Sequence, residues 1–120
     1  MSDKTILIVG TYDTKDDELS YLADRIRQMG GGVVTMDVSV LGEPSSPCDL
    51  SKYDVALAGD STIQATIDTG EENLAMQIMA RGSARLTADL HAEGRIDGVI
   101  VLGGTMGTDL ALDVCQALPL

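Results

Sequence analysis

The segment 103–108, which reads GGTMGT, has the residue types of an anion-binding turn. It follows the apolar run 99–102, which is typical of a strand buried on both faces, and precedes residues 109–112, which begin a helix. A strand, a glycine turn and a helix start direct several backbone N–H groups toward one point, where the helix dipole adds partial positive charge. The segment therefore predicts a phosphate site. Its binding residues are Gly103, Gly104, Thr105, Gly107 and Thr108.

The glycine pattern of this turn matches neither of the common nucleotide motifs. No Gly-Lys-Ser/Thr follows the glycines, so the turn is not a Walker A loop, and the GxGxxG pattern is incomplete. Glycines that only connect a strand to a helix explain the spacing as well as phosphate binding does.

A second group of candidate residues follows the apolar run 5–9 near the start of the chain. Gly10, Thr11, Asp13 and Thr14 are predicted at the carboxyl end of that strand, where ligands bind in open α/β sheets. Thr14 fits equally well as the N-cap of a helix whose first turn contains three consecutive acidic residues. Both interpretations of its hydroxyl group stand.

Two further side chains are candidates for nucleotide contacts. Asp37 lies near the end of the predicted strand 33–38, where nucleotide-binding folds place an acid that bonds ribose hydroxyls. The alternative is a solvated acid at a strand end. Arg81 is the cation of the long predicted helix that is placed to reach phosphates, and the alternative is an exposed helix arginine.

The elements that would position these residues form an α/β pattern. Between the strands 5–9 and 33–38, apolar residues recur at helical spacing, and three glycines then end the helix. Those apolar residues are Leu19, Leu22, Ala23, Ile26 and Met29. A strand, a helix and a strand at this length predict parallel strands with a right-handed crossover. We expect a three-layer α/β/α, Rossmann-like fold with a parallel sheet of order 2-1-3.

The middle of the chain is predicted to be irregular and then helical. Residues 39–50 contain two of the three prolines and form a long connection across the top of the sheet. Residues 53–58 fit a strand or a helix. We favour a helix, because alanine is poor in strands and Gly59 suits a helix C-cap. Asp49 or Ser51 is its expected N-cap.

Two more helices are predicted before the last strand. Ser61 or Thr62 caps a short one that ends at Gly70, and a long one runs from Glu71 to about Glu93. The apolar side of the long helix is marked by Leu74, Ile78, Leu86 and Leu90. Gly82 interrupts that stripe, which indicates a close approach of a neighbouring backbone.

Composition excludes several classes of protein. The net charge of -11 opposes binding to a nucleic-acid backbone or an anionic membrane. Cys48 and Cys115 are too few and too far apart for a disulfide framework or a zinc motif. No apolar run is long enough to span a bilayer, and no secretory signal is apparent, so we expect a cytoplasmic protein.

Four segments in order resemble one family. GTYDTKDDELSYLADRI, DVSVLGEP, MARGSARL and EGRIDGVIVLGGTMGT are similar to the start of the ATP-binding proteins typified by the tomato mosaic virus resistance protein. Members of that family are mostly bacterial and fungal proteins of unassigned activity. The resemblance implies that residues 1–120 are the first lobe of a two-lobed nucleotide-binding region. It also implies that residues 10–14 and 103–108 line an ATP site, with Asp37 and Arg81 as further candidates.

Three functions remain open. The favoured one is a regulatory module that binds ATP, with or without Mg²⁺, through glycine and threonine turns after the first and third strands. The second is an enzyme lobe acting on a phosphorylated small molecule, with Asp13 or Asp109 as a metal ligand or base. His91 has no second histidine or nearby cysteine, and no nucleophile–base pair is evident. The third is a structural lobe whose sheet edge pairs with another lobe or another copy of the chain.

Overall fold

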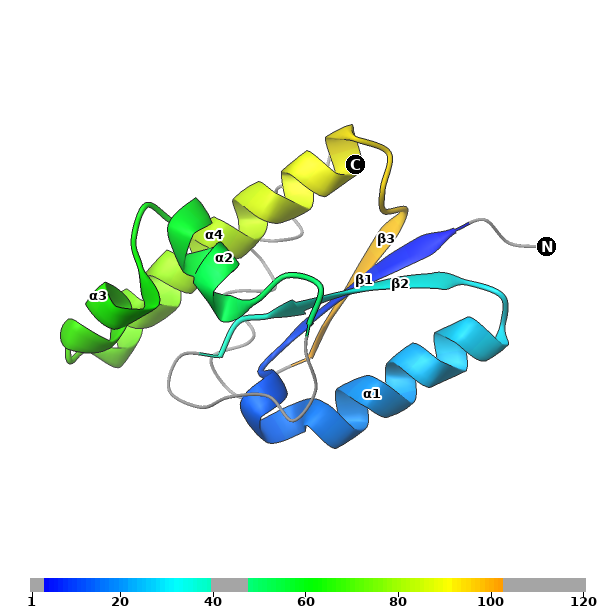
Figure 1. Ribbon diagram of the computed structural model, residues 1–120, viewed down its shortest axis with the longest axis horizontal. Coiled ribbons are helices and arrows are strands. Elements are labelled where there is room, and N and C mark those ends of the chain that lie inside the picture. Colours follow the sequence, from blue (N-terminus) through cyan, green and yellow to red (C-terminus); the bar gives the residue numbers. More distant parts are fainter. Residues whose placement is uncertain (1–3, 40–47, 103–120) are drawn as a thin grey trace.

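In the described part of the chain, three parallel strands form a sheet in the order β2-β1-β3 (Figure 1). They are β1 (Thr5–Gly10), β2 (Gly32–Asp37) and β3 (Gly98–Leu102). The structure is a computed structural model and describes residues 4–39 and 48–102. The predicted fold class, strand order and direction are confirmed. The turn 103–108 and the helix expected after it lie outside the described residues.

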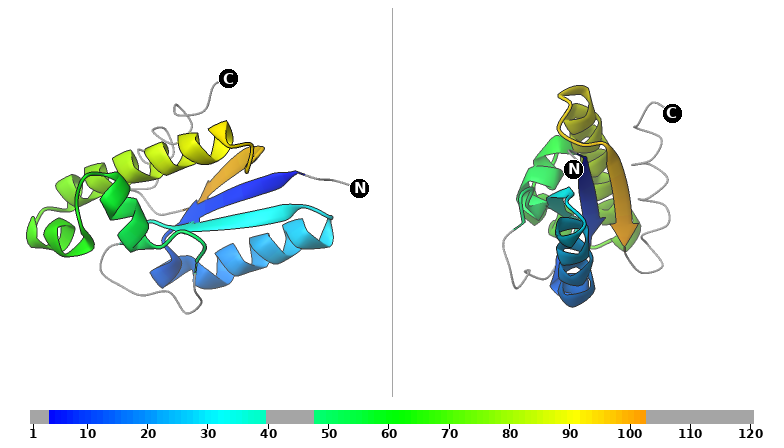
Figure 2. Two further views of the ribbon diagram at one scale, coloured as in Figure 1. Left: turned by 45° about the horizontal axis from the view of Figure 1, so that its top comes forward. Right: turned by 90° about the vertical axis from the view of Figure 1, so that its right-hand side faces the viewer.

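Helices cover both faces of the sheet (Figure 2). Helix α1 (Tyr12–Gln28) packs on one face, where Ile8 of β1 meets Leu19 and Ala23. The other face carries α2 (Lys52–Ala58), α3 (Ile63–Asp68) and α4 (Glu72–Ala92). Leu7 and Val9 pack into that second core with residues of these helices. Successive side chains of β1 therefore pack into two separate apolar cores, one on each face of the sheet, as expected for a central strand.

Helix α1 begins earlier than the sequence predicts. The sequence predicts the acidic residues 16–18 in the first helical turn and offers Thr14 as one candidate N-cap, but the helix starts at Tyr12 and its N-cap is Thr11. The Thr11 side chain makes no capping hydrogen bond. Instead, the Tyr12 N–H donates to Asp37 Oδ1 at 3.3 Å, so an acceptor from β2 serves the first helical residue. At the other end, Met29 is exposed and outside the apolar face.

The ambiguous segment before Gly59 is a helix, as predicted. Ser51 is the N-cap of α2 and forms a capping box with Asp54. Asp49 has a different role, because its carboxylate accepts from the N–H and hydroxyl of Thr35 on β2. Thr62 caps α3 by accepting from the Ala65 N–H at 3.1 Å.

Residues 48–50 run beside β2 and pair with it locally. Leu50 forms a parallel bridge with Met36, donates its N–H to Thr35 O and accepts from the Asp37 N–H. These bonds close the carboxyl-terminal part of the outer edge of β2. Residues 40–47 of the predicted connection lie outside the described residues.

Helices α2 and α4 cross at unusually short range. A Cβ on Gly82 would collide with Val55 O, and one on Gly59 would collide with Ile78 O. The predicted close approach at Gly82 is therefore confirmed as a helix–helix contact. The buried face of α4 is rotated from the predicted stripe, because Leu74 is exposed. That face includes Ala75, Met79, Ala80, Ser83, Thr87 and Leu90.

Candidate functional site

The carboxyl ends of all three strands lie level with one another. Gly10 at the end of β1 pairs with Asp37 of β2 on one side and with Leu102 of β3 on the other. The predicted turn 103–108 follows Leu102 in sequence and lies outside the described residues. The strand residues that precede the two glycine-containing segments, Gly10 and Leu102, therefore end at one edge of the sheet.

The first turn of α1 lies at this edge, directly after Gly10. Thr11 is its N-cap, and Asp13 and Thr14 are the second and third residues of the helix. Backbone N–H groups in the first turn of a helix have no intrahelical acceptor and face the helix entrance. Of Asp13 and Thr14 the structure describes the backbone alone, so any side-chain contact of theirs with a ligand stays a prediction.

Asp37 is buried, with 1% of its surface exposed. Its Oδ1 accepts from the Tyr12 N–H at 3.3 Å, the Ser39 N–H at 2.9 Å and the Ser39 hydroxyl at 2.7 Å. The alternative of a solvated strand-end acid is therefore wrong. The carboxylate joins the end of β2 to the start of α1, and its predicted ribose contact is untested.

Two polar residues at this edge were missed in the sequence. Ser39 is buried against Asp37, and Lys52 is buried with 3% of its surface exposed. Lys52 follows closely on Leu50, whose carbonyl accepts from the Asp37 N–H at 3.0 Å. Its Nζ lies 5.5 Å from the centre of the Tyr53 ring. A lysine at the first position of a helix gives no local sign of burial, so periodicity did not reveal it.

Three other buried hydroxyls of the described residues serve their own helices, whereas the buried Tyr12 hydroxyl donates to Ile8 O of β1 at 3.3 Å. Thr66, Ser83 and Thr87 donate to carbonyls three or four residues earlier. Such bonds satisfy a buried hydroxyl locally. Buried polar groups that link different elements are instead found around Asp37.

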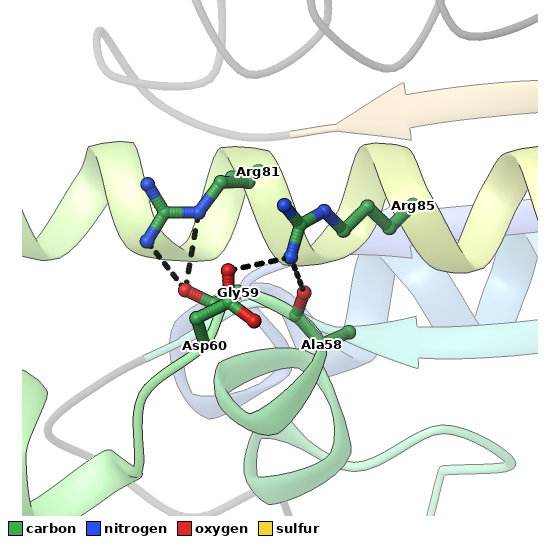
Figure 3. A network of polar contacts seen from close by, with 5 residues as sticks. All are labelled: Ala58, Gly59, Asp60, Arg81 and Arg85. Carbon is green, nitrogen blue, oxygen red and sulfur yellow. Dashed lines mark hydrogen bonds and ion pairs between the residues drawn. The ribbon is translucent and has the colours of Figure 1, made fainter.

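Arg81 lies at the contact between α4 and α2 (Figure 3). Its Nε and guanidinium N–H groups both donate to Gly59 O, at the C-terminus of α2. Among the described residues, its hydrogen bonds join two helices and none reaches the strand ends. The predicted phosphate contact of Arg81 thus has no support from these bonds and remains untested.

Arg85 completes the contact one turn further along α4. Its Nη1 donates to Ala58 O at 2.9 Å and forms an ion pair with Asp60 Oδ2 at 2.8 Å. The hydrogen bond and the positive charge of Arg85 hold the pKa of Asp60 below its ordinary value, and the charge of Arg81 adds to this. Both arginines therefore supply donors to carbonyls at the end of α2, which the helix itself leaves unpaired.

The described residues offer no alternative centre of metal chemistry. Within residues 4–39 and 48–102, no three histidine, cysteine, aspartate or glutamate side chains are grouped to hold a metal ion. His91 lies in the last turn of α4. No helix in the described part of the chain is long and apolar enough to cross a membrane.

Comparison with known proteins identifies relatives along the whole chain. A UPF0261 protein of Brucella suis biovar 1 is 51% identical over 115 residues, which cover 96% of this chain and 28% of the relative. A UPF0261 protein of Clostridium tetani is 37% identical over 116 residues, covering 97% of this chain and 29% of the relative. The chain thus spans a little over a quarter of the length of these relatives.

The resemblance to the family typified by the tomato mosaic virus resistance protein is also confirmed. The ToMV resistance protein Tm-1(GCR237) of Solanum lycopersicum is 28% identical over 134 residues, covering 96% of this chain and 17% of the tomato protein. Residues 4–120 match the model of the N-terminal domain of the uncharacterised protein family UPF0261. The chain therefore belongs to the UPF0261 family and corresponds to its N-terminal domain.

Proposed function

We propose that this chain is a nucleotide-binding module that holds ATP across the carboxyl edge of its sheet. The observation that carries the proposal is the alignment of Gly10 with Asp37 and Leu102. In this alignment Gly10, which precedes α1, and Leu102, which precedes segment 103–108 in sequence, end side by side at the edge where parallel α/β sheets bind ligands. The resemblance to a family of ATP-binding proteins points to the same ligand.

Backbone groups supply the binding chemistry in this proposal. The N–H groups of the predicted turn 103–108, and of the helix expected after it, would attract an anion without any basic side chain, which suits a chain with a net charge of -11. Glycines let the backbone approach a phosphate closely. Gly103, Gly104, Thr105, Gly107 and Thr108 form the phosphate turn, and Gly10, Thr11, Asp13 and Thr14 contact the same nucleotide. Mg²⁺ accompanies the phosphates.

The test compares the full-length protein with residues 1–120. ATP, ADP and GTP, each with Mg²⁺, are titrated while the unfolding temperature is followed. A ligand that binds the native state alone raises that temperature, and the stabilisation grows with the logarithm of the ligand concentration above the dissociation constant. We expect ATP to stabilise the full-length protein. The absence of a shift with every nucleotide would reject the proposal, and a shift confined to the full-length protein would show that a second lobe completes the site.

A structural role in assembly is the second candidate. In the described part of the chain β3 pairs with β1 alone, and its Ile100 is 37% exposed. An apolar strand with an open ladder favours pairing with another strand. The partner would be a further lobe of the same cytoplasmic protein or a second copy in a homo-oligomer. A catalytic role for Asp13 or Asp109 remains the third alternative.

A further inference from the structure

Asp37, the last residue of β2, accepts a hydrogen bond from the first residue of helix α1. We infer that it is a positioning residue, a built-in anion that fixes the first turn of α1 and directs the phosphates of the bound nucleotide away from it. This inference rests on the proposed function and assigns an orientation to the ligand. The α1 side of the edge then receives an uncharged part of the nucleotide, the ribose or the base.

The hydrogen bonds of Asp37 support the positioning role. Its Oδ1 accepts from one group of α1 and from two groups of Ser39, and it lies within 3.3 Å of each donor atom. The side chain is almost completely buried. A carboxylate held in this way fixes two neighbouring backbone segments at once, and it is poorly exposed for a direct bond to a ribose hydroxyl.

The charge of Asp37 supports the directing role. A helix N-terminus attracts phosphate because its N–H groups are unpaired and its dipole is positive there. At α1 the Tyr12 N–H already faces a carboxylate. Like charges separated by a few ångströms in a partly buried site repel strongly, so a phosphate at the same helix entrance meets an unfavourable field.

The composition of the first two turns adds to this repulsion. Residues 12–18 contain Asp13, Asp16, Asp17 and Glu18, against the single cation Lys15. Within this segment the acidic residues outnumber the one cation, so its side chains add no excess of positive potential to the helix start. The start of α1 therefore favours neutral polar groups that accept or donate hydrogen bonds without carrying charge.

The experiment measures two affinities in the full-length protein. The dissociation constants of ATP and of adenosine are determined by calorimetry for the natural protein and for Asp37→Asn, which keeps an acceptor but removes the charge. We expect the ratio of ATP affinity to adenosine affinity to rise by about threefold to tenfold, as for the loss of a nearby like charge. Asp89→Asn, which removes an exposed charge on α4, is the matched control and leaves the ratio unchanged.

Two outcomes of this titration overturn the inference. An equal loss of ATP and adenosine affinity would make Asp37 a direct ribose ligand. If the ratio of ATP affinity to adenosine affinity is the same in Asp37→Asn as in the natural protein, Asp37 does not direct the phosphates. Failure of the natural protein to bind either ligand rejects the proposed function instead.

A second measurement tests positioning without any ligand. Asp37→Ala removes the acceptor of the Tyr12 N–H, so hydrogen exchange in the first turn of α1 should accelerate, whereas Asp37→Asn should largely restore protection. Exchange that is the same in all three proteins would overturn the positioning role, whatever the protein binds.

Discussion

Gly82 of α4 faces the carbonyl of Val55 on α2 so closely that no side chain fits between them. Helix backbones approach this closely where one of them carries glycine. The contact joins the two main helices on one face of the sheet, and it supports the strand ends indirectly through Leu50 and Ser51, which lead into α2.

We expect Gly82→Ala to destabilise the protein by about 1–3 kcal/mol, as for overpacked cores. In an exposed helix the same exchange would stabilise by about 1 kcal/mol, so the sign of the effect is diagnostic. Urea unfolding followed by circular dichroism measures the difference. Ala92→Gly, at the exposed end of α4, reports the helix-propensity effect alone. A more stable Gly82→Ala protein would contradict the contact.

The ion pair of Asp60 with Arg85 predicts a dependence of stability on pH. Because the pKa of Asp60 is lowered in the folded state, mainly by Arg85, its contribution is fully present above the ordinary aspartate pKa. It is lost as the pH falls through the folded-state value. We expect Asp60→Asn to be less stable than the natural protein at neutral pH. In strong acid, and in high salt at neutral pH, the difference should shrink. A difference that is independent of pH would show that the charge is unimportant.

Replacement of Gly104 by valine tests the phosphate turn. A β-branched side chain at this position blocks close approach of the backbone to an anion, so we expect ATP binding to be lost while the far-ultraviolet circular dichroism stays unchanged. Calorimetry on the full-length protein measures the affinity. Unchanged affinity in a folded Gly104→Val protein would place the phosphates elsewhere.

The side of β3 that no other described strand pairs with predicts self-association of residues 1–120. Apolar strands with unpaired ladders associate, and at physiological salt the repulsion from the net charge of -11 is screened within about 8 Å. We expect dimers or larger species at high concentration by sedimentation, at low and at high salt. Ile100→Lys should shift the population toward monomer. Ile67→Lys, at a position on α3 that is also 37% exposed, should not. A strictly monomeric natural chain at millimolar concentration and high salt would reject this prediction.

The sequence predicted the sheet well because its signals are local. Apolar runs, glycine stops and a βαβ spacing determine the strands and their order, and Gly59 identified α2 as a helix. The predicted start of α1 was wrong because the first helical N–H group, that of Tyr12, is paired with Asp37, which lies 25 residues away in sequence. The burial of Lys52 and the exposure of Leu74 likewise depend on which neighbours pack against a helix, and periodicity within that helix does not reveal them.

The bonds of Asp49 and Leu50 to β2 have a consequence for the order in which the protein is built. They close the carboxyl-terminal part of one margin of the sheet, and they use residues that leave the ribosome before β3 is synthesised. Among the described residues, the ladder that is open along its whole length is on β3. A strand that joins this sheet from elsewhere therefore finds a complete set of open backbone groups at β3 and only the amino-terminal part of one at β2.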